Sequence, residues 1–458
     1  MVAVTCTDIH LIALFKAPNV WANPLMTDEI ALKLNAETIA AKDLRYAWYV
    51  AVVLMLCNTL SFIDRQILGL LVTPIKLELG ISDTRIGLLQ GLAFGIFYTL
   101  LGMPIGRIVD RSNRRKLVVV GISLWSLMTA TCAAARGFWT LFLSRMGVGV
   151  GEATLSPSAF SLLSDYFPKE RLGTALSIFS MGVFFGSGSA LIVGGLVIGA
   201  VGSWRLTFLI VGLPGLLAAV LAYTIKEPPR NHLLSGKGSK LTFREVFEQI
   251  KLRWQSVTGI CLAFAFQAMC NYAQQAWLPT YFVRAHGWQP RQAGLTLGVI
   301  SLSTGLMGAY AGGTLCDRWQ ARSKTDAPLR VAVLATICAG LFFTLAMAVS
   351  TLKVQLVLLV PAFFFLAMPI GSAYASLQLI LPNQVRGQVG ALQVFTLNLI
   401  GLILGPFLPG FFNDYVFKDP LMVGWSLAVT VGMASLLSAI LFRATWRPYR
   451  EHYAQMHG

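Results

Sequence analysis

The 458-residue chain is 56% hydrophobic and only 12% charged, and its mean hydropathy is +0.67. A soluble globular domain has about a quarter of its residues charged, so this composition excludes an ordinary soluble protein. The net charge of +16 could suggest nucleic-acid binding, but the basic residues lie between apolar segments, which is a pattern of membrane topology.

The first 45 residues are expected to form an N-terminal cytoplasmic extension. Residues 1–25 have neither the basic start nor the long apolar core of a cleavable signal peptide, and Met26 would be a better start of the protein. Residues 26–44 could form a short amphipathic helix.

Twelve apolar runs follow, each of roughly the twenty residues that cross a hydrocarbon core about 30 Å thick. Because the runs are continuous rather than alternating, they predict helices and not strands. The fold class is therefore an all-α membrane protein with twelve transmembrane helices. The runs lie near residues 47–73, 86–106, 117–135, 138–163, 173–200, 206–225, 255–283, 293–315, 330–350, 354–381, 389–412 and 421–442.

A polar stretch at 226–254 divides the chain into two six-helix bundles, 46–225 and 255–442, and residues 443–458 form a cytoplasmic tail. The stretch begins as a linker and ends as an amphipathic surface helix. The halves also share motifs: GRIVDR and ALSIF in the first correspond to GTLCDR and ALQVF in the second. A six-helix unit used twice is typical of secondary transporters, whose sites lie between the repeats.

Most of the 36 Lys and Arg residues fall on the side of the even-numbered loops and the termini. The positive-inside rule therefore predicts a multi-pass protein of the plasma (inner) membrane with both termini in the cytoplasm.

The seven cysteines and five histidines show no paired or ligand spacing, so neither disulfides nor a metal site is expected. No Walker motif is present, and no catalytic cluster accompanies the acids, so neither an ATP-driven pump nor an enzyme is expected.

Four formal charges lie well inside predicted spans: Asp64, Arg65, Arg145 and Glu152. Each costs at least about 2.5–3.5 kcal/mol near the bilayer centre, so they need partners or water. We interpret Asp64 and Glu152 as proton carriers, Arg65 as the residue that tunes them, and Arg145 also as a partner for a substrate headgroup or carboxylate. The alternative is a static salt-bridge network that only fixes helix packing.

Helical spacing gives these charges a geometry. Arg145, Gly149, Glu152 and Ser156 form one stripe, while Gly147 and Gly151 allow another helix to approach closely. In the first span Asn58, Ser61 and Arg65 share a face, with Asp64 about 100° around the helix. The candidate substrate-binding residues are Arg145, Asn58, Ser61, Ser156, Gln267, Asn271, Gln275 and Tyr374.

The polar residues of the second half could equally form hydrogen bonds between helices, worth roughly 0.6 kcal/mol each. That half shows no formal charge inside its spans. A substrate with a polar head beside the first half and an apolar tail against the second half would be amphiphilic.

The cytoplasmic motifs are expected to form a gate; its residues are Gly106, Asp110, Arg111, Arg114, Asp317 and Arg318. If these charges only set the orientation of the protein in the membrane, this would explain the arginines but not the aspartates.

The stretch GMPIGRIVDRSNRRK resembles the loop 2–3 signature of the major facilitator superfamily, with Asn113 where that family prefers Gly. SFIDR, together with SRMGVGVGEATLSPSAFSLLSDYFPKERLGTALSIF, resembles the spinster subfamily. The resemblance implies that the first and fourth helices line a central cavity. It also implies a lysolipid or sphingoid substrate, since relatives of that subfamily export such molecules.

The sequence thus predicts a proton-coupled secondary transporter that works by alternating access on an amphiphilic or anionic substrate. The proton is the expected coupling ion, and no other cofactor is expected. The expected partners are the substrate and membrane lipids, and no nucleic acid. The protein is expected to be a monomer. The alternative is a symporter of protons with a small organic anion or sugar acid. A non-transporting membrane sensor would need an appended domain, which the sequence does not show.

Overall fold

The computed structural model describes residues 24–229, 243–322 and 324–457, and within these ranges the regular structure is entirely helical. The first half contains α2 (Pro24–Gln66), α3 (Leu68–Leu79), α4 (Asp83–Gln90), α5 (Leu92–Val109), α6 (Arg114–Thr131), α7 (Phe138–Glu152), α8 (Leu155–Tyr166), α9 (Lys169–Val201), α10 (Trp204–Gly212) and α11 (Pro214–Tyr223). The second half contains α12 (Phe243–Leu252), α13 (Trp254–His286), α14 (Pro290–Ala321), α15 (Ala327–Ala348), α16 (Leu352–Ala367), α17 (Pro369–Ile380), α18 (Asn383–Thr396), α19 (Ile403–Phe411), α20 (Val423–Ala444) and α21 (Trp446–His457). Short turns of other helix types are η2 (Cys132–Ala134), η3 (Leu397–Leu402), η4 (Phe412–Phe417) and η5 (Pro420–Met422).

The all-helical fold class is confirmed. Across the described ranges, 11 helical segments are long and apolar enough to cross a membrane. The expected span over 138–163 is not among them, because a turn at Ala153–Thr154 divides it into α7 and α8, which have 15 and 12 residues. This is the span that carries Arg145 and Glu152.

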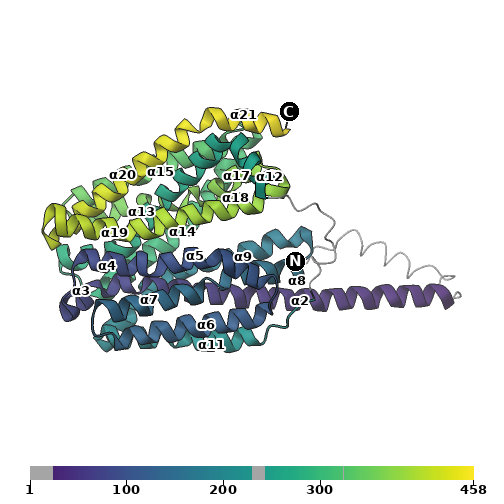
Figure 1. Ribbon diagram of the computed structural model, residues 1–458, viewed down its shortest axis with the longest axis horizontal. Coiled ribbons are helices and arrows are strands. Elements are labelled where there is room, and N and C mark those ends of the chain that lie inside the picture. Colours follow the sequence, from purple (N-terminus) through teal and green to yellow (C-terminus); the bar gives the residue numbers. More distant parts are fainter. Residues whose placement is uncertain (1–23, 230–242, 323, 458) are drawn as a thin grey trace.

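The helices form two bundles that meet at one end of the molecule and separate toward the other (Figure 1). Helices α2–α11 make up the lower bundle in that view and α13–α20 the upper one. We call the end where α3 and α4 meet the upper bundle the closed end. The opposite end, where α20 leads into α21, is the terminal end.

Glycines let the two bundles touch near the closed end. A Cβ on Gly69 of α3 would lie 2.8 Å from the Gln275 carbonyl oxygen of α13, and one on Gly87 of α4 would lie 2.7 Å from the Pro406 carbonyl oxygen of α19. Both contacts join backbone to backbone, so no larger residue fits there without moving a helix.

The first span differs from the prediction at both of its ends. Helix α2 runs without interruption from Pro24 to Gln66, so residues 26–44 belong to the same helix as the start of the first span, which begins at Leu44, instead of forming a separate short helix. Ile67 then separates α2 from α3, within the run expected over 47–73. The helix expected at the end of the linker is present as α12, whereas residues 1–23 and 230–242 lie outside the described ranges.

Candidate transport site

The four charged residues predicted to meet do lie together in the first bundle. Asp64 and Arg65 come from the last turn of α2, and Arg145 and Glu152 from α7. The exposed fractions are 2% for Asp64, 0% for Arg145 and 1% for Glu152. Charges buried this deeply need partners within the protein, and each of the four has a different set.

Glu152 is the partner of Arg65. The Arg65 Nη2 atom lies 2.6 Å from Glu152 Oε2, and Arg65 Nε donates to the same oxygen at 3.2 Å. Ser61 Oγ donates to it as well, at 2.9 Å. The other carboxylate oxygen, Oε1, is buried and has no hydrogen-bond partner among the described residues. All three donors therefore converge on one oxygen and leave the second one unengaged.

Aromatic rings surround the Arg65 guanidinium. Its central carbon lies 4.6 Å from the ring centroid of Phe62, 4.4 Å from that of Phe94 and 4.8 Å from that of Tyr98. Each ring face attracts a cation within about 6 Å. Tyr272 of α13 packs against the same apolar core, so this arginine lies close to the boundary between the two bundles.

Arg145 is bound to backbone, not to a carboxylate. Its Nη1 and Nη2 atoms donate to the carbonyl oxygens of Asp64 and Arg65, at 3.2 and 3.1 Å. The last carbonyls of a helix have no helical N–H donor, and α2 ends at Gln66. Arg145 therefore caps the end of α2 inside the bundle. Its suggested role in binding substrate stays a prediction.

Asp64 points toward α6. Trp125 and Thr129 of that helix lie beside its carboxyl group. The Oδ2 atom of Asp64, Nε1 of Trp125 and Oγ1 of Thr129 are all buried, and none has a hydrogen-bond partner in the described part of the chain. Asp64 thus occupies the interior of the first bundle, beside the Arg65–Glu152 pair but on another face of α2.

The predicted stripe along the fourth span is divided between two helices. The turn at Ala153–Thr154 places Ser156 in α8, where it is half-buried, while Arg145 and Glu152 lie in α7. The small residues behave as predicted: a Cβ on Gly151 would lie 2.7 Å from the Gly121 carbonyl oxygen of α6. The fourth span therefore packs closely on the third.

Three other substrate candidates form hydrogen bonds to backbone carbonyls of neighbouring helices. Asn58 is buried and donates to the Phe179 carbonyl oxygen at 3.1 Å. Gln267 and Asn271 both donate to the Leu366 carbonyl oxygen, at 3.1 and 3.5 Å. These three bonds join helices, which is the packing alternative raised by the sequence.

Two candidates on the second bundle are more open. Tyr374 is exposed, with its ring edge-on to that of Phe264 at 5.1 Å, and Gln275 is half-buried next to Gly69. Of the substrate candidates in this bundle, Tyr374 is therefore the most accessible.

The predicted gate residues divide into two groups. Asp110, Arg111, Asp317 and Arg318 are exposed, and none of them forms an ion pair with another described residue. Gly106 is half-buried, and a Cβ there would meet open space.

Arg114, the buried member of the expected gate, has its ion-pair partners within the first bundle and the linker. It begins α6, is buried, forms ion pairs with Asp165 and with Glu227 (2.7 Å), and donates to the Pro228 carbonyl oxygen at 3.0 Å. Because α6 turns this side chain inward, it fastens the start of the linker to the first bundle.

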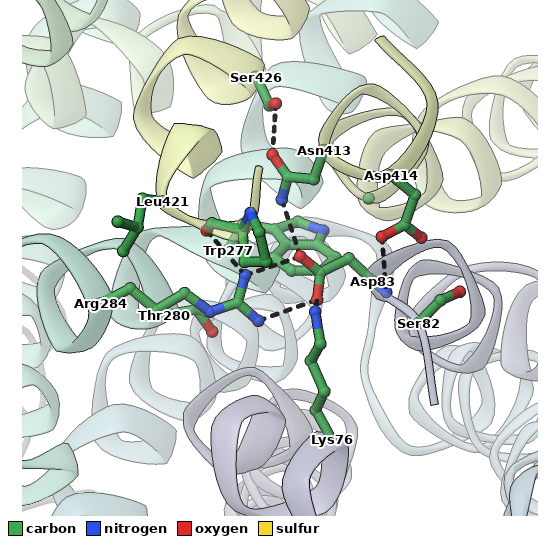
Figure 2. Close-up of polar contacts among 12 residues, drawn as sticks. Lys76, Ser82, Asp83, Trp277, Thr280, Arg284, Asn413, Asp414, Leu421 and Ser426 are labelled. Carbon is green, nitrogen blue, oxygen red and sulfur yellow. Dashed lines mark hydrogen bonds and ion pairs between the residues drawn. The ribbon is translucent and has the colours of Figure 1, made fainter. Parts of the chain in front are cut away.

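A second polar cluster, for which the sequence shows no motif, joins the bundles at the closed end (Figure 2). Asp83, at the start of α4, has a fully buried side chain. Its carboxylate accepts hydrogen bonds from Arg284 Nη1 and Nη2 at 2.7 and 2.9 Å and from Lys76 Nζ at 2.7 Å. It also accepts one from Asn413 Nδ2 at 3.1 Å. Arg284 and Asn413 belong to the second bundle, so one carboxylate connects both.

Asp414 completes this closed-end cluster from the other side. Its Oδ2 atom accepts from Thr84 N and Thr84 Oγ1, both at 2.6 Å, and its Oδ1 atom accepts from Asp83 N at 3.3 Å. A carboxylate is stabilised at a helix N-terminus, and here the carboxylate comes from η4 of the opposite bundle. We define the closed-end cluster as Lys76, Asp83, Thr84, Arg284, Asn413 and Asp414.

Comparison with known proteins gives a family match over most of the chain. The family model of the Major Facilitator Superfamily matches residues 54–406. Protein spinster homolog 1 of Xenopus tropicalis is 28% identical over 433 residues, covering 90% of this chain and 80% of that protein. The sphingosine-1-phosphate transporter SPNS2 of the same species is 26% identical, with 92% and 88% covered. A hexuronate transporter of Bacillus subtilis (strain 168) is 28% identical, with 83% and 92% covered.

Among solved structures, a bacterial homolog of the human lysosomal transporter Spinster, crystallised in an inward-facing and unoccupied conformation, superposes with a TM-score of 0.73. It is 25% identical in sequence, and the match covers 90% of this chain and 98% of that one. The similarity therefore extends over almost the whole fold.

Proposed function

Because the chain belongs to the Major Facilitator Superfamily, we propose that it is a proton-coupled secondary transporter that moves an amphiphilic, lysolipid-like or sphingoid-like substrate by alternating access. Membership makes it a membrane transporter and not an enzyme. Proton coupling, the substrate class and the mode of movement are the parts proposed.

The observation that carries the proposal is the uneven environment of Glu152. Its Oε2 atom holds Arg65 and Ser61, while its buried Oε1 atom has no hydrogen-bond partner among the described residues. A proton arriving at Oε1 would cancel the charge that attracts Arg65 at the other oxygen. Proton and arginine thus compete for one negative charge, and this competition is what a coupling site requires.

A change at this pair can reach the other bundle. Arg65 lies among Phe62, Phe94 and Tyr98, and Tyr272 of the second bundle packs against the same core. Release of Arg65 would therefore alter contacts at the boundary between bundles. Buried polar groups in membrane proteins usually mark such sites, since they are costly to keep.

The proposed substrate follows from how polar and apolar groups are distributed. The four charges of the transport site, on α2 and α7, belong to the first bundle, and the accessible candidate on the second bundle is the aromatic Tyr374, next to Phe264. A molecule with a polar head and an apolar tail matches that distribution. The likeness to a sphingosine-1-phosphate transporter supports the same class.

A second candidate is a sugar-acid:proton symporter, and the similarity to a hexuronate transporter favours it. A small acid would use an arginine as its binding partner. Both site arginines are already engaged, Arg65 by Glu152 and Arg145 by backbone carbonyls. We therefore place the amphiphile first.

We further propose an inner-membrane location with both termini in the cytoplasm, on the distribution of basic residues. The closed end would then face outward and the terminal end the cytoplasm. The likeness to an inward-facing relative supports that orientation. The transporter is proposed to act as a monomer, with the proton as its coupling ion.

Flux into proteoliposomes tests the proposal. Lysophosphatidylcholine, sphingosine and glucuronate are compared with and without an imposed pH gradient. Wild-type protein should move an amphiphile faster with the gradient, and Glu152→Gln should lose that gain while keeping exchange of labelled for unlabelled substrate. Glu78→Gln is the matched control, because Glu78 pairs with Arg205 in the same bundle at 2.8 Å. Equal gradient-driven flux in wild type and Glu152→Gln would refute the coupling role, and flux of glucuronate alone would favour the second candidate.

A further inference from the structure

Helix α6 carries two polar side chains next to the buried carboxyl group of Asp64. Trp125 and Thr129 are four residues apart, so they lie on one face of the helix, and the exposed fraction of each is 0%. Both lie beside the Asp64 carboxyl group, which comes from the last turn of α2. We call these two residues the α6 pair. The ion pair of Arg65 and Glu152 involves neither of them.

The polar atoms of the α6 pair and of Asp64 lack other partners. Asp64 Oδ2, Trp125 Nε1 and Thr129 Oγ1 are each buried without a hydrogen bond to a described residue. A buried polar atom that never forms a hydrogen bond is costly, and most such atoms in proteins have a partner. Because the three atoms belong to neighbouring side chains, hydrogen bonds among them can satisfy all three.

Glycines of two other helices let the bundle pack closely on the α6 pair. A Cβ on Gly151 of α7 would lie 2.9 Å from Trp125 Cβ, and one on Gly212 of α10 would lie 2.9 Å from Thr129 Cγ2. Larger residues at these two positions would press on the pair, whereas glycine allows direct contact. The α6 pair is therefore held by packing that does not involve Asp64.

The charged and titratable groups around Asp64 have bonds of their own. Arg145 and Glu152 of α7 and the thiol of Cys132 lie close enough to influence its charge. Arg145 donates to backbone carbonyl oxygens, and Glu152 is bound to Arg65. The Cys132 thiol donates to a backbone carbonyl oxygen at 3.4 Å. Helices α9 and α10 carry charged residues only in their first turns, and α11 carries none.

We propose that Trp125 and Thr129 are positioning residues that set how tightly Asp64 holds its proton, by donating hydrogen bonds to the carboxylate when the proton leaves. The proposal deepens the proton coupling proposed above and rests on it. In the step itself the proton passes to water, and the carboxyl group gains one negative charge.

The chemistry of the two donors gives the direction of their effect. The indole N–H of Trp125 can only donate, so it stabilises the ionised carboxylate more than the neutral acid. The hydroxyl of Thr129 can also accept, so it can stay bonded to Asp64 in both forms. Asp64 and Glu152 thereby have separate determinants of proton affinity, the α6 pair for one and Arg65 for the other.

Infrared spectroscopy of the protein in nanodiscs tests this directly. The C=O stretching band of a protonated carboxyl group reports the proton, and the part that belongs to Asp64 is what Asp64→Asn removes. Followed against pH, this part gives the midpoint at which Asp64 loses its proton. Loss of a donor to the carboxylate makes Asp64 keep its proton to a higher pH. Trp125→Phe and Thr129→Val should therefore each raise the midpoint by about 1–2 pH units.

Thr129→Val keeps the shape of the side chain, so it tests the hydrogen bond with little change in packing. The matched controls are Thr207→Val and Trp204→Phe, which replace buried residues of the first bundle. Thr207 donates to the Ser203 carbonyl oxygen at 2.8 Å, and Trp204 donates to Glu78 at 2.5 Å. Neither control should change the midpoint.

The possible results separate the proposal from a purely structural role. An unchanged midpoint in a folded variant would refute the role of the residue that it replaces. An equal shift in the controls, or an Asp64 band that does not titrate in the wild type, would overturn the whole proposal. The spectrum reports the proton whether or not the protein transports, so a failure here is distinguishable from a failure of proton-driven flux.

Discussion

Asp83→Asn is the substitution that most directly tests the closed-end cluster. Asp83 accepts two bonds from Arg284 and one from Asn413, all three from the second bundle. Its bond to Lys76 lies within the first bundle and persists whichever end is open. Asparagine keeps the size of the side chain but offers one acceptor oxygen and no charge, so at most one of the Arg284 bonds survives.

The size of the effect follows from that loss. A hydrogen bond to a charged group contributes about 1.5–3 kcal/mol, and one such bond between the bundles disappears. The preference for keeping this end closed should fall by that amount. Since about 1.4 kcal/mol corresponds to a tenfold change in an equilibrium constant, the open population should rise roughly 10- to 100-fold.

Cysteine labelling measures that population. Thr280 of α13 is 2% exposed, and its Oγ1 lies 3.4 Å from the Gly69 carbonyl oxygen of the first bundle. A Thr280→Cys variant should react slowly with a water-soluble maleimide, and at least tenfold faster when Asp83→Asn is added. The described native cysteines are buried except for the half-buried Cys338, whose rate is subtracted using the chain without Thr280→Cys. Glu78→Gln is again the control. Unchanged labelling in folded Asp83→Asn protein would refute a role of the cluster in closure.

Three further outcomes are expected. Arg145→Met should lower the free energy of unfolding by about 1–3 kcal/mol for each carbonyl it leaves without a donor; an unchanged Tm would contradict the capping role. Burial would raise the pKa of Asp326, but hydrogen bonds from Arg330 and Arg450 outweigh it and hold that pKa below the ordinary 3.8. The ionised Asp326 therefore stabilises the fold above about pH 4, and this stabilisation is lost as the pH falls further. The substitution Asp326→Asn should make Tm depend less on pH in the acid range. Parallel curves of Tm against pH for the variant and the wild type would contradict this role of Asp326. Gly151→Val should destabilise the packing of α7 on α6, because its Cβ would lie 2.7 Å from the Gly121 carbonyl oxygen; a wild-type Tm would disprove that close approach.

The spans and the meeting of four charges were predictable because both depend on short-range patterns. Apolar runs set helix length, and the spacing of Arg145 from Glu152 places both on one side of a helix. The pairing within the group was not predictable. Arg145 and Arg65 carry the same charge, and only the end of α2 at Gln66 shows why one arginine binds backbone while the other binds Glu152.

The closed-end cluster could not be predicted, because its members come from four separate parts of the chain. Asp83 and Arg284 each look like an ordinary charge at the end of an apolar run. Asp414 looks like a loop residue, and only the approach of η4 to α4 gives it two backbone donors. A sequence contains no local signal for such a contact; at most, the Ser82 cap predicts where the helix begins.

Helix α3 connects the transport site to the closed end. It follows directly after Arg65 and the break at Ile67, touches α13 at Gly69 and carries Lys76 into the closed-end cluster. Its 12 residues span about 18 Å at 1.5 Å per residue. Arg145 holds the carbonyls on the α2 side of the break, so loss of the Arg65–Glu152 contact would leave α2 capped while removing a restraint next to the start of α3. Helix α3 is then the segment free to respond, and it contacts both Asp83, through Lys76, and the α13 backbone, through Gly69. Protonation of Glu152 and opening of the closed end can therefore be parts of one transition.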